Sequence, residues 1–164
     1  MQSDRWREKF RSKREVGALR LVAPLVVAAF CAAPALAQSV EAVNGVLDTI
    51  FGEHERFEMA FETLQSAVAD GDAQAVAELA AYPLVVKVGE RREIADAAPF
   101  VAAYETIMTD EIVTAVRDQS YAELFANDQG IMFGNGQVWM SGVCADDACA
   151  DWDVRIITIQ STAP

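Results

Sequence analysis

The chain contains a single histidine, His54, and this residue could carry proton-transfer chemistry. It recurs at helical spacing with Phe57 and Phe61 on the apolar face of a predicted long helix. An imidazole in an apolar pocket can act as a general base, with a pKa set by its burial. A histidine in such a position can equally be a core residue hydrogen-bonded to the backbone or to one acid. Both interpretations predict that the ring of His54 faces the interior.

Two further residues are candidates to move protons together with His54. Tyr104 lies on a predicted helix, and Asp128 lies in a predicted turn. Either could present a hydroxyl or carboxyl group to a cavity. The structural alternatives are that Tyr104 only packs its ring and that Asp128 belongs to a turn rich in Gly and Asn.

Two residues of predicted strands are candidates for contacting a ligand. These are Trp139 and Arg155. Strict alternation in the terminal strand, residues 151–160, puts Arg155 on one face with Ile159 and puts Val154 on the other. A buried guanidinium needs an acidic or carbonyl partner, for which Asp128 and Asp153 are available. Arg155 could orient an anion on a pocket wall, or it could extend to solvent at the edge of the sheet.

The cysteines predict one structural disulfide. Cys144 and Cys149 enclose four polar or small residues between two predicted strands, which is typical of a bond across a hairpin end. The alternative, a redox-active pair, usually has two residues between the cysteines at a helix start. The acidic side chains of residues 146–153 could hold a hard cation such as Ca²⁺, or they could form a solvated loop. Otherwise the sequence predicts no metal site and calls for no cofactor.

The first 37 residues are typical of an export signal. Seven Lys and Arg residues precede or begin an apolar run over residues 21–33, and Ala35-Leu36-Ala37 has the form of a cleavage site. The alternative, a retained membrane anchor, needs about 20 apolar residues, and this run is shorter. We therefore predict cleavage after Ala37, a mature chain over residues 38–164, and a periplasmic or secreted location.

The charge of the mature chain limits its partners. Of the 25 acidic and 13 basic residues of the whole chain, 22 acidic and six basic ones follow Ala37. The resulting charge of −16 repels nucleic acid and anionic lipid. We expect no nucleic-acid partner and no membrane association once the signal is removed.

The predicted elements place helices first and hairpins last. A long helix is expected over residues 43–68, with shorter helices over 73–81, 97–108 and 110–117. Strands are expected over residues 84–88, 91–94, 131–133, 137–144 and 151–160. This order lacks a βαβ rhythm and predicts one α+β domain, with N-terminal helices packed on a curved antiparallel sheet.

Several segments resemble the NTF2-like superfamily, whose fold is also called cystatin-like. The resemblance rests on the long first helix, Asp70-Gly71-Asp72, Tyr82-Pro83-Leu84-Val85-Val86, and the block over residues 124–139. It implies a cone of helices on a curved sheet and a homodimer through the open sheet face. The block over residues 124–139 is similar to blocks in exported bacterial proteins of this type. The superfamily includes both enzymes and binding modules, so the fold implies no single activity.

The sequence thus leads to two functional hypotheses. The first is an exported domain that holds a small apolar ligand or a protein partner in or on the cone. The alternative is an isomerase, lyase or hydrolase that uses His54 with Tyr104 or Asp128 on a hydrophobic substrate. An enzyme of that kind requires two titratable groups to reach one point beside a cavity, whereas an interaction module requires an exposed apolar patch.

Overall fold

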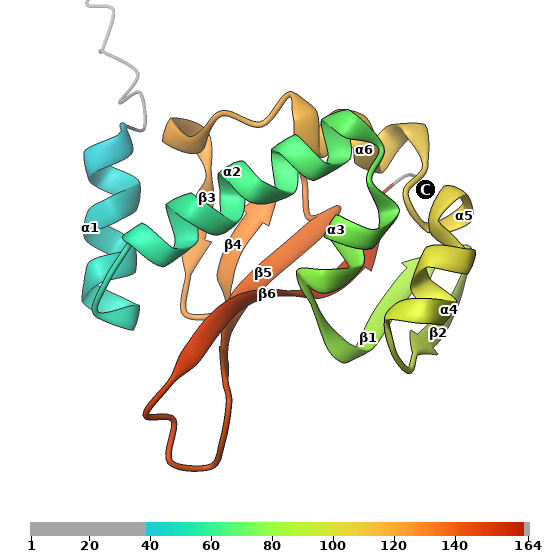
Figure 1. Ribbon diagram of the computed structural model, residues 1–164. Coiled ribbons are helices and arrows are strands. Elements are labelled where there is room, and N and C mark those ends of the chain that lie inside the picture. The colour runs from blue at the N-terminus through green and yellow to red at the C-terminus, as the bar shows by residue number, and fades with distance from the viewer. Residues whose placement is uncertain (1–38, 163–164) are drawn as a thin grey trace, which may run out of the picture. The chain divides into compact units, whose positions relative to one another are not determined.

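The structure is a computed structural model that describes residues 39–162 (Figure 1). The predicted export signal, residues 1–37, lies outside the described residues. The described chain is an α+β unit in which three helices, two strands, three more helices with a 3₁₀ turn, and four strands follow one another, and the six strands form one curved, open sheet. The predicted fold class is therefore confirmed. Among the described residues, no helix combines the length and apolar character needed to cross a bilayer.

Polar caps define where several helices begin. The side chains of Ser39, Asp72 and Asp96 each accept hydrogen bonds from backbone N–H groups of the first turn that follows. The helices are α1 (Val40–Phe51), α2 (Glu55–Asp70), α3 (Ala73–Glu78), α4 (Ala97–Ala102), α5 (Tyr104–Ile107) and α6 (Asp110–Arg117), and a 3₁₀ turn, η1, spans Tyr121–Glu123.

The predicted long first helix is wrong, because it is two helices. Gly52 ends α1 in a left-handed conformation, with φ of 88°, and α2 restarts at Glu55. Glycine adopts this conformation at little cost, so its N–H can close the end of α1 onto Asp48. Figure 1 shows α1 turned away from the direction of α2. The uninterrupted apolar spacing across Gly52 hid this break.

The six strands form one mixed sheet. They are β1 (Ala80–Val88), β2 (Glu90–Ile94), β3 (Phe125–Asn127), β4 (Gly130–Phe133), β5 (Val138–Cys144) and β6 (Trp152–Gln160), in the order β2-β1-β6-β5-β4-β3. Four neighbouring pairs are antiparallel, as predicted, but β1 and β6 run parallel. These two strands lie far apart in the sequence, so no turn between them could have indicated their direction.

One face of the sheet builds the core. Phe133, Val138, Ile159 and Val86 are successive partners across four strands, and all four are fully buried. Helix α2 crosses this face and contacts β6, while α6 packs against α2 (Figure 1). Burial of this apolar face is the main stabilising term of such a two-layer arrangement.

An irregularity in β6 changes which residues face the core. Met140 pairs with Ile156, but the preceding Trp139 pairs with Thr158, so β6 has one extra residue at Ile157. Such a bulge reverses the alternation beyond it. Ile159 is consequently buried on the same face as Ile156, and the prediction that it shares a face with Arg155 is wrong.

The turn between β3 and β4 requires glycine at one position. Gly130 has φ of 114°, and a Cβ atom added there would lie 1.9 Å from the carbonyl oxygen of Met140. The backbones of β4 and β5 therefore approach too closely for any other residue. The short strand β3, which the residue pattern did not indicate, pairs with β4 through this turn.

Candidate functional site

His54 lies at the junction of α1 and α2 rather than on a buried helix face. Its side chain is 25% exposed, and its Nδ1 atom lies 2.8 Å from Oδ1 of Asp48. The break at Gly52 places His54 directly before α2, so it does not lie on the apolar face of one long helix as predicted, and its side chain is partly buried. The hydrogen bond to Asp48, aided by the charges of Glu55 and Glu58, raises the pKa of His54 above 6.5.

The same junction holds three side chains that could together ligate a metal ion. Ligand atoms of Asp48, His54 and Glu55 lie within 4.8 Å of one another. Together they offer one nitrogen and two carboxylate donors, a set suited to a divalent transition metal. In the structure, Nδ1 of His54 is engaged by Asp48, and both carboxylates are exposed.

Tyr104 is a packing residue with an unusual hydroxyl group. Its side chain is buried on α5, and its ring meets that of Phe100 edge to face, with centroids 6.1 Å apart. The hydroxyl is buried and has no hydrogen-bond partner among the described residues. Burial raises the pKa of Tyr104, which leaves it protonated at neutral pH.

The structure does not bring the three proton-transfer candidates together. His54 follows α1 at one end of the helical layer, and Tyr104 lies on α5 at the opposite end (Figure 1). Asp128 is exposed in the turn between β3 and β4. Proton transfer at one substrate atom needs its acid and base within hydrogen-bond reach of that atom, and these residues do not meet that requirement.

The space between α2 and the sheet is occupied by side chains. Phe61 of α2 stacks on Phe133 of β4, with ring centroids 5.2 Å apart and planes at 11°. Phe57 and Met140 are fully buried in the same layer. An apolar ligand therefore has no room between these side chains, and the outer surfaces of the unit are the places where one could bind.

The outer face of the sheet presents a continuous row of side chains centred on Trp139. Strand pairing aligns Val85, Thr158, Trp139, Met132 and Phe125 across β1, β6, β5, β4 and β3. We call these five residues the outer row. Phe125 is 46% exposed, the other four are half-buried, and the rings of Phe125 and Trp139 meet edge to face at 6.3 Å. Helix α1 borders the row at its Phe125 end, where Val43 and Val46 line a hollow together with Phe125. Helix α2 covers the opposite, core face of the sheet (Figure 1).

A shallow hollow adjoins the row. It has a volume of about 220 Å³, and its lining includes Trp139, Ile157 and Thr158 together with the polar ends of Lys87 and Gln160. Ligand pockets for small molecules typically have about 300–1,000 Å³. The hollow is below that range, so it fits one side chain of a partner better than a whole ligand.

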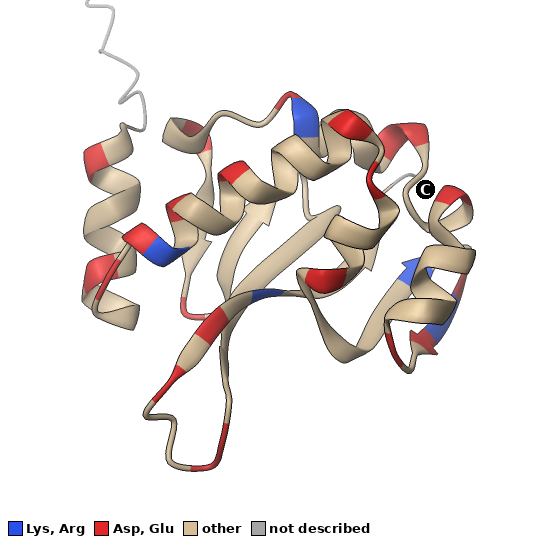
Figure 2. Cartoon of the chain, in the orientation of Figure 1, with Lys and Arg blue, Asp and Glu red and all other residues tan. Residues whose placement is uncertain are grey.

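Acidic residues are almost absent from the strands. Of the 22 acidic residues that follow Ala37, only Glu90, Glu93 and Asp153 lie in a strand. Figure 2 shows the acidic segments on the helices and loops, with the central strands nearly free of them. The five residues of the outer row carry no charge, and the row continues on β2 with the acidic Glu93 beside Val85. Like-charge repulsion against another surface is therefore lowest at the centre of the row, around Trp139.

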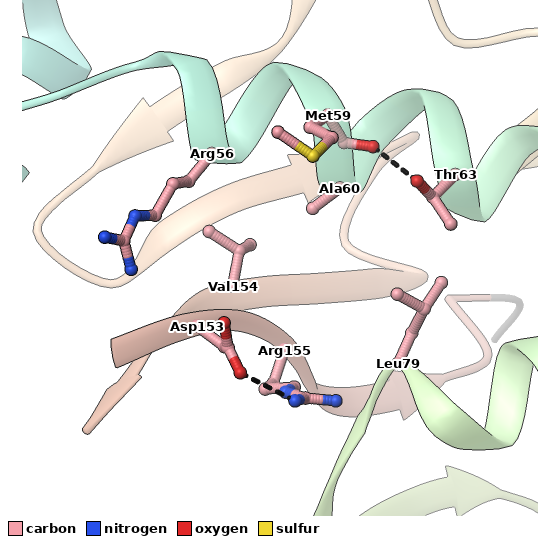
Figure 3. A pocket seen from close by; sticks show the side chains of 8 residues that line it. All are labelled: Arg56, Met59, Ala60, Thr63, Leu79, Asp153, Val154 and Arg155. Atoms are coloured by element: carbon pink, nitrogen blue, oxygen red, sulfur yellow. Dashed lines mark hydrogen bonds and ion pairs between the residues drawn. The ribbon is translucent and has the colours of Figure 1, made fainter. Parts of the chain in front are cut away.

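Arg155 lines a groove between β6 and α2, away from the hollow beside Trp139. Its guanidinium group is 2.7 Å from Asp153 Oδ2 and donates a hydrogen bond of 2.5 Å to the carbonyl oxygen of Glu78. Of the two acids proposed for it, Asp153 is thus the partner and Asp128 is not. The groove has about 370 Å³ and runs between α2 and β6, with Met59 and Val154 among its lining residues (Figure 3).

The cysteine prediction is confirmed, because Cys144 and Cys149 form a disulfide. It closes the tip of the hairpin between β5 and β6, which extends beyond the rest of the sheet (Figure 1). The acidic side chains of residues 146–153 do not converge into a group of three ligands in this part of the described chain.

Two features of the surface were not found in the sequence. Met59 is 65% exposed on α2, although methionine usually indicates a core position. Glu111 of α6 accepts four hydrogen bonds from the end of the chain and from Gln137. The exposure of Met59 was indicated only weakly, by its position off the apolar face of the helix. The contacts of Glu111 depend entirely on segments that are distant in the sequence.

Comparison of the chain with protein-family models, with curated proteins and with solved structures finds no match. The candidate surfaces therefore rest on the geometry described above.

Proposed function

We propose that this chain is an exported interaction domain of NTF2-like fold that binds through the outer face of its sheet, and that its first partner is a second copy of itself. The observation that carries the proposal is the outer row. It spans five strands, about 19 Å at the usual strand spacing, and this breadth is typical of a protein contact rather than of a small ligand.

Charge supports pairing of two copies through this face. A mature charge of −16 repels a second copy wherever acidic side chains would meet. The outer row has none, although Glu93 of β2 continues it beyond Val85, and Trp139 is its middle residue. A two-fold axis near Trp139 would bring each row against the other, as an isologous dimer requires. Aromatic residues and methionine, both present here, are enriched in the centres of protein interfaces.

The disulfide and the N-terminal leader support export. Disulfides persist in oxidising compartments such as the periplasm or the extracellular space, and Cys144 and Cys149 are bonded. The basic and apolar leader of residues 1–37 has the composition of an export signal. Expression of the full chain in a bacterial host, followed by fractionation and N-terminal sequencing, is expected to give a periplasmic protein that begins at Gln38.

The self-pairing is tested by analytical ultracentrifugation of the mature chain over a range of concentrations. Trp139→Glu puts a carboxylate at the centre of the outer row, and we expect the dimer dissociation constant to rise at least tenfold. Met59→Glu is the matched control, because Met59 is exposed on α2 and lies away from the row. A wild-type chain that stays monomeric at millimolar concentration would overturn the self-pairing, and equal effects of both variants would remove the role of the outer row.

A further inference from the structure

The first half of β6 has a free edge. Residues Trp152, Asp153, Val154 and Arg155 pair with β5 on one side. On the other side, pairing with β1 begins only at Ala80 and Ile156. The edge of β6 from Trp152 to Arg155 therefore has no neighbouring strand among the described residues, and it borders the groove beneath α2 (Figure 3).

The direction of the backbone groups along this edge follows from one hydrogen bond. The N–H of Ile156 donates to the carbonyl oxygen of Leu79 at 2.8 Å, so the polar groups of Ile156 point away from β5. Backbone groups alternate in direction along a strand. Those of Val154 and Trp152 must then also point away from β5, and the carbonyl oxygen of Trp152 does so, because it accepts a hydrogen bond from Arg56.

Val154 is left with two unpaired backbone groups. Neither its N–H nor its C=O has a partner in the part of the chain that the structure describes. Val154 is only 6% exposed, so these groups have restricted access to solvent. Buried backbone donors and acceptors are paired in the great majority of cases. The N–H and C=O of one residue, directed the same way, match one residue of another extended strand.

Arginines delimit this opening at both ends. Arg56 occupies the carbonyl of Trp152, and Arg155 donates to the carbonyl of Glu78. Each guanidinium is also paired with an acid, Glu53 and Asp153 respectively. The edge between them stays open at Val154. Above it, α2 presents the exposed side chain of Met59, which gives the groove an apolar wall.

The groove leads into an acidic one. Thr63 lines both, and the second groove has about 460 Å³. Its acidic residues are Glu62, Asp70 and Asp72, and no basic residue lines it. An occupant that continues from the first groove into the second would therefore be favoured by positive charge.

We infer that the groove between α2 and β6 binds an extended peptide segment of a protein partner, in which one residue forms a two-hydrogen-bond pair with Val154, an apolar side chain contacts Met59, and basic side chains follow toward Glu62 and Asp70. This mode adds a strand to an open sheet edge. A second copy of this acidic chain would be repelled by the acidic groove. The site is separate from the outer row, so it stands or falls independently of the proposed self-pairing.

The probe is a blocked synthetic peptide, acetyl-Lys-Leu-Val-Leu-Lys-Lys-amide, titrated into the mature chain to millimolar concentration and followed by NMR. We expect the amide of Val154 to shift and to exchange with solvent at least tenfold more slowly in the complex. A series of peptides with one backbone nitrogen methylated at a time removes each N–H in turn. One member is expected to bind at least tenfold more weakly, because its N–H pairs with the carbonyl of Val154.

Two variants separate backbone pairing from charge. Val154→Pro removes the N–H at an edge position, where proline is tolerated, and should weaken binding at least tenfold. Because proline also changes a buried side chain, a second variant tests the charge of the acidic groove. The double variant Glu62→Gln with Asp70→Asn is expected to bind the peptide threefold to tenfold more weakly. Glu105→Gln on α5 is its control. Three results would each overturn the inference. The first is equal binding of all methylated peptides, and the second is a Val154 amide that does not shift at saturation or at millimolar peptide. The third is a Val154 amide that shifts when the protein alone is diluted.

Discussion

Glu111, in the first turn of α6, accepts a hydrogen bond of 2.9 Å from the backbone N–H of Thr162, two residues beyond the end of β6. The same carboxylate also accepts hydrogen bonds from Ser161 and Gln137. It thereby ties the end of the chain to the helical layer. These donors, with the N–H of Thr162 as the largest cause, lower the pKa of Glu111 from 4.5 to about 2.

The first prediction concerns acid stability. A carboxyl group whose pKa is lower in the folded chain stabilises the fold when ionised, so this contribution is present above pH 4.5 and is lost as the pH falls toward 2. Glu111→Gln should lower the melting temperature at pH 7, and the difference from the wild type should shrink below pH 4.5. Thermal unfolding followed by circular dichroism between pH 7 and pH 2.5 checks this. A difference that is constant over that range would contradict it.

The second prediction concerns the titration of His54. The hydrogen bond that His54 donates to Asp48 is the largest cause of its raised pKa, so Asp48→Asn should lower that pKa toward 6.5 or below. A raised pKa stabilises the fold with the protonated ring, below pH 6.5, and this contribution is lost as the pH rises through the folded-state value. NMR titration is direct because the chain has one histidine. Glu53→Gln is the control, since Glu53 pairs with Arg56 and should leave the titration unchanged.

The third prediction compares the buried Tyr104 with the partly buried Tyr121. The hydroxyl of Tyr104 has no partner in the described chain, whereas that of Tyr121 donates to Asn44 at 2.9 Å. Tyr104→Phe should leave the free energy of unfolding unchanged or raise it by about 1 kcal/mol, because it removes an unsatisfied buried group. Tyr121→Phe should lower it by about 1 kcal/mol. Urea unfolding measures both, and equal losses in the two variants would show that the hydroxyl of Tyr104 is satisfied in solution.

The fourth prediction compares the two faces of the sheet. Phe133 is fully buried and stacks on Phe61, whereas Phe125 is 46% exposed on the outer row. Phe133→Ala should cost about 3–5 kcal/mol of unfolding free energy. Phe125→Ala should cost about 1 kcal/mol or less in the monomer. Chemical denaturation at low protein concentration distinguishes them, and similar losses would mean that the outer row is covered within one chain.

Local chemistry made much of the fold predictable. Two helices begin at Ala73 and Ala97, as predicted, each capped by the aspartate that precedes it, and the cysteines bond across the hairpin as their spacing indicated. These features depend on residues close together in the sequence. The order of helices before hairpins was also sufficient to predict the α+β class, because an apolar helix face and an apolar sheet face must cover each other.

The sites were less predictable, because each depends on where distant segments meet. The apolar spacing around His54 indicated one helix, but a left-handed residue at Gly52 ends α1 and places the partly buried ring beside Asp48 at the junction of two helices. Likewise, Asp128 and Asp153 were both possible partners of Arg155 from the sequence, and only the strand geometry selects Asp153.

The sequence by itself determined the caps, the turns, the disulfide and the two-layer class, since these follow from short-range hydrogen bonding and from apolar periodicity. The tertiary structure alone decided the parallel pairing of β1 with β6, the bulge that buries Ile159, and the row that aligns Phe125 with Val85 across five strands. The pairing of β1 with β6 joins segments that are remote in the chain, so its register is set by which faces become buried and not by a connecting turn.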